Sequence, residues 1–257
     1  RSSVLRLDMS EYVEQHSTAR LIGAQPGYVG YEEGGLLTEA IRKRPFQIVL
    51  FDEIEKAHGD VLNILLQVLD EGHLTDSSGK RVSFANTVIV LTSNLGAQKI
   101  VETKKSIGFG SSVDNLKQSV EQEVIKEAQS KLPPELWGRL DERLYFAPLD
   151  REDVGKIADL QLSFSSKALF REREITLKWY KKTINYLLER GGYAPHFGAR
   201  GMRQTIQRLV EAPISELILA KKLCSGDMAV LNIKDEALYI EKKSSINDKE
   251  MTTLSVV

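Results

Sequence analysis

The sequence has little cysteine and histidine, and it lacks any long apolar run. The single cysteine, Cys224, excludes an internal disulfide framework and a multi-cysteine zinc or iron–sulfur site. The 4 histidines show no metal-ligand spacing. No apolar stretch approaches the roughly 18 residues of a membrane span, and the first residues do not resemble a signal peptide. We therefore expect no membrane helix and a reducing compartment, either the cytoplasm or the matrix or stroma of an organelle.

The chain also lacks an excess of charge of either sign. It has 35 basic and 36 acidic residues, a formal net charge of −1. The overall charge therefore does not favour nucleic acid or an anionic membrane as a partner. With 42% hydrophobic and 28% charged residues, the composition excludes general disorder and is typical of a globular protein with a sizeable core. The length of 257 residues predicts one large domain, or a large and a small one.

Continuous apolar runs without alternation predict strands that are covered on both faces, as in a parallel sheet. Three such runs cover residues 4–7, 46–51 and 87–91. A fourth strand is predicted at Leu144–Phe146. The spacing of Val61, Leu65 and Val68 predicts a helix between the second and third strands. This alternation favours an α/β fold in which a parallel sheet is flanked by helices on both faces.

Past Pro148 the pattern changes to that of a smaller, mainly helical α+β domain. Helices are predicted around residues 154–164, 184–188 and 202–218, and strands around 175–179, 228–233 and 238–240. Pro213 should bend or split the last of these helices. We therefore expect a large α/β domain over residues 1–149, a small domain over 150–241 and a disordered tail over 242–257.

Two carboxylates follow the second predicted strand, where an apolar run ends at Asp52 and Glu53. This is the layout of a Walker B motif, and ligands bind at the carboxyl edge of open parallel sheets. Asp52 is the candidate Mg²⁺ ligand, and Glu53 is the candidate residue for polarising the attacking water. Asn94, at the tip of the next strand, could hold the same water or the γ-phosphate. The alternative is a strand that ends in solvated acidic residues. The polar Asn94 at the tip of the neighbouring strand favours a nucleotide site instead.

Several motifs, in combination and in order, resemble the second ATPase module of the Clp unfoldases, which are AAA+ ATPases. They are Asp8-Met-Ser-Glu-Tyr12, Gly27-Tyr-Val-Gly-Tyr-Glu-Glu-Gly-Gly35, Asp52-Glu-Ile-Glu-Lys-Ala-His58, Leu65-Leu-Gln-Val-Leu-Asp70, Thr92-Ser-Asn-Leu-Gly96, Arg139-Leu-Asp-Glu142 and Gly198-Ala-Arg200. The resemblance extends to about residue 233 and implies an AAA+ large domain followed by a small one. It also implies ATP and Mg²⁺ as cofactors. The partners that it implies are further copies of the chain in a hexameric ring, unfolded protein substrates that are threaded through the pore, and adaptor proteins.

The resemblance assigns the substrate-gripping pore loop to a short glycine-flanked segment. Its residues are Gly27, Tyr28, Val29 and Gly30. The glycines allow a flexible tip, and Tyr28 offers contact area with little rotamer entropy. The alternative is an ordinary glycine-rich turn with an incidental tyrosine.

Two arginines are assigned nucleotide-sensing roles by the same resemblance. Arg139 matches the arginine finger that reaches the nucleotide of a neighbouring subunit, a role that suits a permanently charged, delocalised guanidinium. Its alternative is a surface ion pair with Asp141 or Glu142. Arg200 matches the second sensor, through which the small domain contacts the nucleotide of its own subunit, and its alternative is a solvated arginine at a helix start.

The family's phosphate loop, G-x-x-x-x-G-K-[ST], does not occur in these 257 residues. In the family it lies upstream of the Asp-Met-Ser-Glu-Tyr segment, so we expect a fragment that starts downstream of the Walker A loop. The full-length protein is then expected to be an ATPase, and this fragment alone to be inactive, because the loop provides the main cradle for the triphosphate. The alternative is a non-hydrolysing module with a structural or ring-assembly role.

A tripeptide after the Asn94 strand bears on the partner of the protein. Ile107, Gly108 and Phe109, preceded by two lysines, resemble the loop with which ClpA and ClpC dock onto a ClpP-type peptidase. Two apolar side chains on either side of a glycine suit an anchor in a pocket. One alternative is an apolar pair that packs against the large domain. The other is a ClpB-type disaggregase that works without a peptidase.

Overall fold

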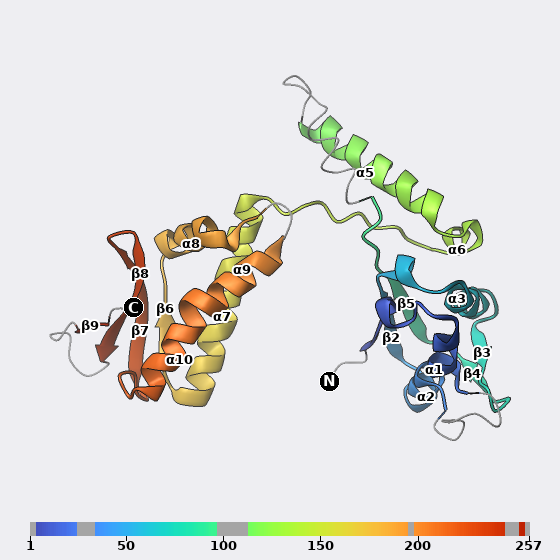
Figure 1. Cartoon of the computed structure of the whole chain (residues 1–257), viewed down its shortest axis with the longest axis horizontal. Helices are drawn as coiled ribbons and strands as arrows, with labels where there is room; N and C mark the ends of the chain where they lie inside the picture. The colour runs from blue at the N-terminus through green and yellow to red at the C-terminus, as the bar shows by residue number, and fades with distance from the viewer. Residues whose placement is uncertain (1–3, 25–33, 97–112, 195–197, 245–251, 255–257) are drawn as a thin grey trace. The chain divides into compact units, whose positions relative to one another are not determined.

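The computed structural model of the chain describes residues 4–24, 34–96, 113–194, 198–244 and 252–254. The chain divides into two units, Arg1–Tyr145 and Phe146–Val257 (Figure 1), and each unit has its own core. No helix among the described residues is long and apolar enough to cross a membrane.

A three-stranded parallel sheet organises the first unit. Its strands are β1 (Val4–Asp8), β2 (Gln47–Asp52) and β5 (Thr87–Leu91), in the order β1-β2-β5 (Figure 1). Asp8 lies opposite Asp52 in the register of β1 and β2. Because both pairings are parallel, the carboxyl ends of all three strands reach the same edge of the sheet. These elements confirm the α/β prediction.

The helices of this unit are α1 (Thr18–Ile22), α2 (Leu36–Lys43), α3 (Gly59–Glu71), α5 (Val113–Lys131) and α6 (Pro134–Gly138), with 3-10 turns at Met9–Glu11, Gln15–Ser17 and Ile54–Lys56. Capping residues determine where α3 begins and ends. His58 Nδ1 accepts a hydrogen bond from the backbone N–H of Asp60 at 3.2 Å, and Gly72 ends the helix in the left-handed conformation, with φ of 66°. Val61, Leu65 and Val68 are buried, as their spacing predicted.

One face of the sheet packs into the core, and the other face is open among the described residues. Leu7, Val49 and Phe51 are buried in the core cluster. Side chains on the opposite face are between 37% and 58% exposed: Val4, Ile48, Val88 and Val90. The prediction of helices on both faces therefore holds for one face only in this part of the chain, because apolar composition alone does not specify what covers a strand.

The predicted strand at Leu144–Phe146 is wrong. Residues 142–150 have no regular secondary structure, and Leu144 and Phe146 are 77% and 84% exposed. A strand requires a neighbour whose backbone N–H and C=O groups are free to pair. No described strand pairs with this segment, so its apolar residues do not produce one.

A small antiparallel hairpin, absent from the sequence prediction, follows α3. Its strands are β3 (His73–Thr75) and β4 (Arg81–Ser83), and the facing residues Leu74 and Val82 are both buried. Strands of 3 residues are too short for alternation to be read from the sequence.

The second unit combines helices with a four-stranded sheet. Its elements are α7 (Arg151–Arg173), β6 (Thr176–Lys178), α8 (Lys181–Leu187), α9 (Ala199–Ile206), α10 (Ala212–Leu219), β7 (Asp227–Lys234), β8 (Ala237–Ser244) and β9 (Thr252–Leu254), with π-helical turns at Leu188–Gly192 and Gln207–Glu211. The sheet order is β6-β7-β8-β9, with β6 parallel to β7 and the other pairs antiparallel. Asp150 begins α7 with a capping box.

The helix predicted around residues 202–218 is split near Pro213, as the sequence predicted. Pro213 lies in the first turn of α10, directly after the π-helical turn, so the missing N–H of proline falls where the hydrogen-bond ladder already changes. One detail of this unit differs from the sequence prediction. The chain past residue 241, predicted as a tail, continues β8 to Ser244 and pairs again with it through β9. An unpatterned stretch can still extend a hairpin when the partner strand offers a free edge.

Candidate functional site

The candidate site lies at the carboxyl edge of the parallel sheet, where the segments after β2 and β5 run side by side. Thr92 N donates to Phe51 O at 2.9 Å, and Ile54 N donates to Thr92 O at 3.0 Å. These backbone bonds bring Asp52 and Glu53 next to Thr92. Residues about 40 positions apart in the sequence therefore form one edge.

Asp52 is held as an oriented carboxylate. It accepts a hydrogen bond from Thr92 Oγ1 at 2.5 Å and one from Arg6 Nε at 3.1 Å, and it forms an ion pair with the same guanidinium. The Thr92 and Arg6 hydrogen bonds hold the pKa of Asp52 below its ordinary value. Asp52 is therefore ionised at neutral pH. A carboxylate of this kind can bind Mg²⁺, which usually has only one or two protein carboxylates among its ligands.

Glu53 has a backbone conformation that is unfavourable for its residue type. Its φ of 58° and ψ of 52° lie in the left-handed region, where a residue other than glycine is uncommon and strained. Its N–H donates to Thr92 Oγ1 at 3.2 Å, and its carboxylate pairs with Lys56 at 2.5 Å. Strain of this kind is concentrated at functional sites, so it supports Glu53 as a candidate functional residue.

Asn94 follows β5 and is exposed, and its backbone N–H donates to Glu55 Oε1 at 3.3 Å. The structure thus brings the backbone of Asn94 to the segment after Asp52. Sequence reasoning missed Thr92 and Arg6 as partners of Asp52. A threonine two residues before Asn94 was a readable signal, whereas Arg6 could be found only through the pairing of β1 with β2.

Arg139 lies at the C-cap of α6, in the first unit. Leu132 and Leu136 are buried in the core, and they fix α6 beside α3. The Arg139 Nε lies 2.5 Å from Asp70 Oδ1, near the end of α3, and the arginine side chain is 55% exposed. The sequence alternative named Asp141 or Glu142 as the ion-pair partner, but in the structure the partner is Asp70. A half-exposed guanidinium of this kind can still reach a further anion.

The remaining predicted residues are distributed as follows. Arg200 is exposed in the first turn of α9, within the second unit. The pore-loop residues Gly27, Tyr28, Val29 and Gly30, and the docking residues Ile107, Gly108 and Phe109, lie outside the described residues. Their roles, and those of the site residues above, stay predictions.

The residues at the sheet edge include one carboxylate suited to bind Mg²⁺ together with a nucleotide. Among the described residues, no cluster of three or more His, Cys, Asp and Glu side chains could hold a metal ion. Mg²⁺ of nucleotide sites needs only one or two carboxylates, with phosphates and water as its other ligands. Asp52 satisfies that requirement, and the exposed Asn94 adds a neutral polar group nearby.

Comparison with known proteins matches each of the two units to a protein family. The family described as "AAA domain (Cdc48 subfamily)" matches residues 1–143. The family described as "C-terminal, D2-small domain, of ClpB protein" matches residues 149–231.

Curated relatives carry the name of one chaperone. The chain is 46% identical over 240 residues to a protein of Rickettsia conorii named "Chaperone protein ClpB". The aligned residues cover 93% of this chain and 27% of the relative. It is 50% identical over 224 residues to the protein of that name from Meiothermus ruber, covering 87% and 25%. It is 42% identical over 255 residues to "Chaperone protein ClpB4, mitochondrial" of Arabidopsis thaliana, covering 97% and 26%. The chain thus spans about a quarter of the length of these relatives.

Proposed function

Because the chain belongs to the AAA domain family and its second unit is a D2-small domain of the ClpB type, we propose that it is the C-terminal ATPase module of a protein-remodelling chaperone. In this proposal the complete protein assembles into a hexameric ring, hydrolyses ATP and threads unfolded polypeptides through its pore. The observation that carries the proposal is the pair of family matches, which together cover most of the chain in the order expected of such a module. The carboxylates at the sheet edge supply its chemistry.

The chemistry is derived from the residues of the first unit. Asp52, ionised and oriented by Thr92 and Arg6, would hold Mg²⁺, which offsets the charge of the transferred phosphoryl group when bound. Glu53 would accept a proton from the attacking water once its carboxylate leaves Lys56. Asn94 would position that water, and Arg139 would act on the nucleotide of the neighbouring subunit. Arg200 would contact the nucleotide from the small domain.

A ClpB-type chaperone that works without a peptidase fits the relatives better than the ClpA- or ClpC-type, peptidase-coupled protein that Ile107-Gly108-Phe109 predicted. All the relatives named above are called ClpB. The peptidase-coupled alternative is supported by Ile107-Gly108-Phe109 alone. The non-hydrolysing alternative is disfavoured, since a structural module would not require the oriented Asp52 and the strained Glu53. We place the protein in the cytoplasm or an organelle matrix; Arabidopsis ClpB4 is named as mitochondrial.

The experiment that tests this proposal is the recovery of an aggregated enzyme. The complete protein should restore activity to the aggregate in an ATP-dependent manner with no peptidase present. Replacing both Ile107 and Phe109 with serine should change the recovery by less than about twofold, because the tripeptide has no docking role in this mode. Failure to recover the enzyme, together with ATP-dependent degradation on addition of a ClpP-type peptidase and loss of degradation in the double variant, would establish the peptidase-coupled alternative instead.

The isolated chain of 257 residues is expected to bind ATP only weakly, with a Kd in the millimolar range or above. It contains Asp52 but no phosphate loop, and the backbone N–H groups and lysine of such a loop provide most of the contacts to the triphosphate. Titration calorimetry with ATP and Mg²⁺ measures this. Micromolar binding would show that the described residues hold the nucleotide by themselves.

A further inference from the structure

The turn after β2 contains a further glutamate, Glu55, to which the proposed chemistry gives no role. Its Oε1 accepts a hydrogen bond from the backbone N–H of Asn94 at 3.3 Å. Its other oxygen, Oε2, is shielded from solvent and has no hydrogen-bond partner among the described residues. A carboxylate oxygen that is removed from water without a donor costs free energy. Stability alone therefore does not explain a glutamate at this position.

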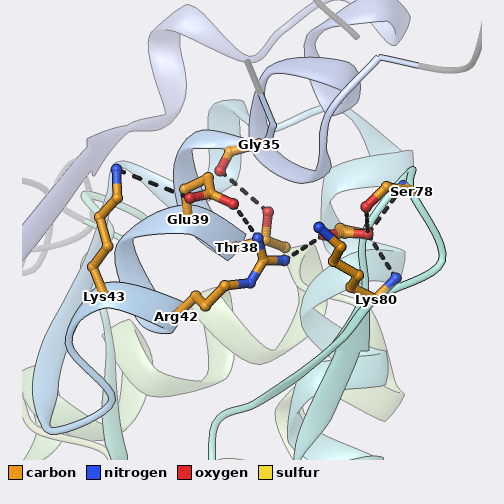
Figure 2. Close-up of polar contacts among 8 residues, drawn as sticks. Gly35, Thr38, Glu39, Arg42, Lys43, Ser78 and Lys80 are labelled. Atoms are coloured by element: carbon orange, nitrogen blue, oxygen red, sulfur yellow. Dashed lines mark hydrogen bonds and ion pairs between the residues drawn. The ribbon is translucent and has the colours of Figure 1, made fainter. Parts of the chain in front are cut away.

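Another shielded carboxylate of the same unit, that of Asp76, shows what a fully satisfied arrangement is. Asp76 is 8% exposed, and its Oδ1 accepts hydrogen bonds from Ser78 N at 3.0 Å, Ser78 Oγ at 2.7 Å and Lys80 N at 2.8 Å. Its Oδ2 pairs with the guanidinium of Arg42. Figure 2 shows Arg42 facing the turn that carries Ser78 and Lys80. Both oxygens of Asp76 have partners, whereas only one oxygen of Glu55 has one.

The turn that carries Glu55 is held firmly on both sides of this residue. Ile54 is 1% exposed in the core, and its N–H donates to Thr92 O at 3.0 Å. His58 N donates to Tyr12 O at 2.8 Å, and Tyr12 is itself buried. The carboxylate of Glu55 therefore extends from a backbone that the core holds in place.

The chain that follows Asn94 is also held in place. Leu95 packs against the core of the first unit. Gly96 has a φ of 79°, in the left-handed region that favours glycine, and a Cβ there would lie 3.0 Å from the Cα of Val124 on α5. Glu55 supplies the acceptor for the N–H of Asn94 itself. The backbone of Asn94 is thus fixed by the packing of its neighbours and by one carboxylate.

The side chain of Asn94, in contrast, is free of such contacts. Asn94 is exposed, and none of the hydrogen bonds among the described residues involves its side-chain amide. A fixed backbone with a free side chain suits a residue that orients a bound group, because the amide can meet a water or a phosphate without any movement of the chain. The contact with Glu55 therefore bears on the chemistry at the sheet edge.

We propose that Glu55 is a positioning residue for Asn94, and that by holding the Asn94 N–H it fixes the side-chain amide at the sheet edge that Asp52 and Glu53 share. This inference rests on the water-positioning role proposed above for Asn94. Glu55 acts through Asn94 and not by contact with the nucleotide. Its contribution therefore appears in kcat for ATP hydrolysis and not in KM for ATP, because an oriented water matters in the transition state and not in ground-state binding.

The test compares two variants of Glu55 in the complete protein. Glu55→Ala removes the acceptor, so kcat should fall by about tenfold or more while KM for ATP stays within about twofold, because misplacing an orienting group has effects of this order. Glu55→Gln keeps a carbonyl oxygen for the Asn94 N–H, so kcat should stay within about threefold of the parent. Equal losses in the two variants would overturn the inference, because the charge and not the hydrogen bond would then matter. Should Glu55→Ala not fold, Glu55→Met, which has a similar volume and no side-chain oxygen, takes its place.

Amide hydrogen exchange at Asn94, measured on the same proteins without nucleotide, tests the contact directly. Exchange should become about tenfold faster in Glu55→Ala, because the N–H loses its acceptor, and should remain within about threefold of the parent in Glu55→Gln. Unchanged exchange in Glu55→Ala would overturn the inference. Glu71→Ala is the matched control. It removes a carboxylate that is 49% exposed and lies 3.3 Å from His73, so it should change kcat and the exchange rate by less than about twofold.

A double-variant cycle with Asn94→Ala separates positioning from general stabilisation. Asn94→Ala keeps the backbone N–H and removes the side-chain amide. If Glu55 acts through that amide, adding Glu55→Ala to Asn94→Ala lowers kcat no further, whereas losses that multiply would overturn the inference. If Asn94→Ala alone leaves kcat unchanged, the water-positioning role of Asn94 fails and the inference on Glu55 falls with it. Hydrolysis by the parent protein in that case would leave the proposed ATPase function standing.

Discussion

Replacing Arg139 with alanine in the complete protein is expected to lower ATP hydrolysis by about 10³-fold or more. An arginine finger that acts in trans contributes 10³–10⁵ to the turnover of related nucleotide hydrolases, because it stabilises the charge of the transferred phosphoryl group. The side chain of Arg139 is 55% exposed and follows a helix anchored in the core by Leu136, so it can serve a neighbouring subunit. Steady-state phosphate release from the assembled ring, at saturating ATP, measures the loss.

The control for Arg139 is Asp70→Asn. This substitution removes the ion pair seen in the structure but keeps the guanidinium. An exposed pair contributes only ~0–1 kcal/mol, so Asp70→Asn should change hydrolysis by less than about fivefold. Equal losses in the two variants would mean that Arg139 serves only as the partner of Asp70, the ion-pair interpretation that the sequence left open.

Glu53→Gln is expected to lower hydrolysis by about 10²–10⁴-fold, the range of a general base, while nucleotide binding persists. The substitution removes the carboxylate that would take the proton from water. It leaves Asp52, with its hydrogen bond from Thr92 at 2.5 Å, in place to hold Mg²⁺. Single-turnover hydrolysis and the retention of bound ATP by the isolated ring measure the two effects separately.

Lys56→Gln tests whether the effect of Glu53 passes through its ion pair. Lys56 is the partner of Glu53 at 2.5 Å, and the carboxylate survives in this variant. Hydrolysis should therefore remain within about threefold of the parent, in keeping with an exposed pair. A Lys56→Gln variant as inactive as Glu53→Gln would assign Glu53 a structural role in the turn after β2.

Much of the site could be predicted because its signals are local. The apolar run that ends at Asp52 and Glu53 specifies a buried strand and polar groups at its tip, whatever else surrounds it. The helical spacing of Val61, Leu65 and Val68 likewise depends only on neighbours along the chain. These patterns follow from the periods of the backbone, so they could be read before any tertiary contact was known.

The partners of the charged groups were decided by tertiary structure alone. Arg6 meets Asp52 because β1 pairs with β2 in one register, and Arg139 meets Asp70, not its chain neighbours, because α6 packs beside α3. Proximity outside a helix or strand does not follow from sequence spacing, since it is set by which apolar faces pack together.

The same physics explains the wrong strand and the missed hairpin. The segment Leu144–Phe146 has the apolar composition of a strand but no neighbour to pair with among the described elements, whereas the 3-residue strands β3 and β4 find each other. The amino-acid sequence by itself determined the class of fold, the motifs and the position of the carboxylates. Only the packed chain decided which strands found a partner, which side chains became ion pairs and where Glu53 took its strained backbone, because each of these depends on groups brought together from distant parts of the chain.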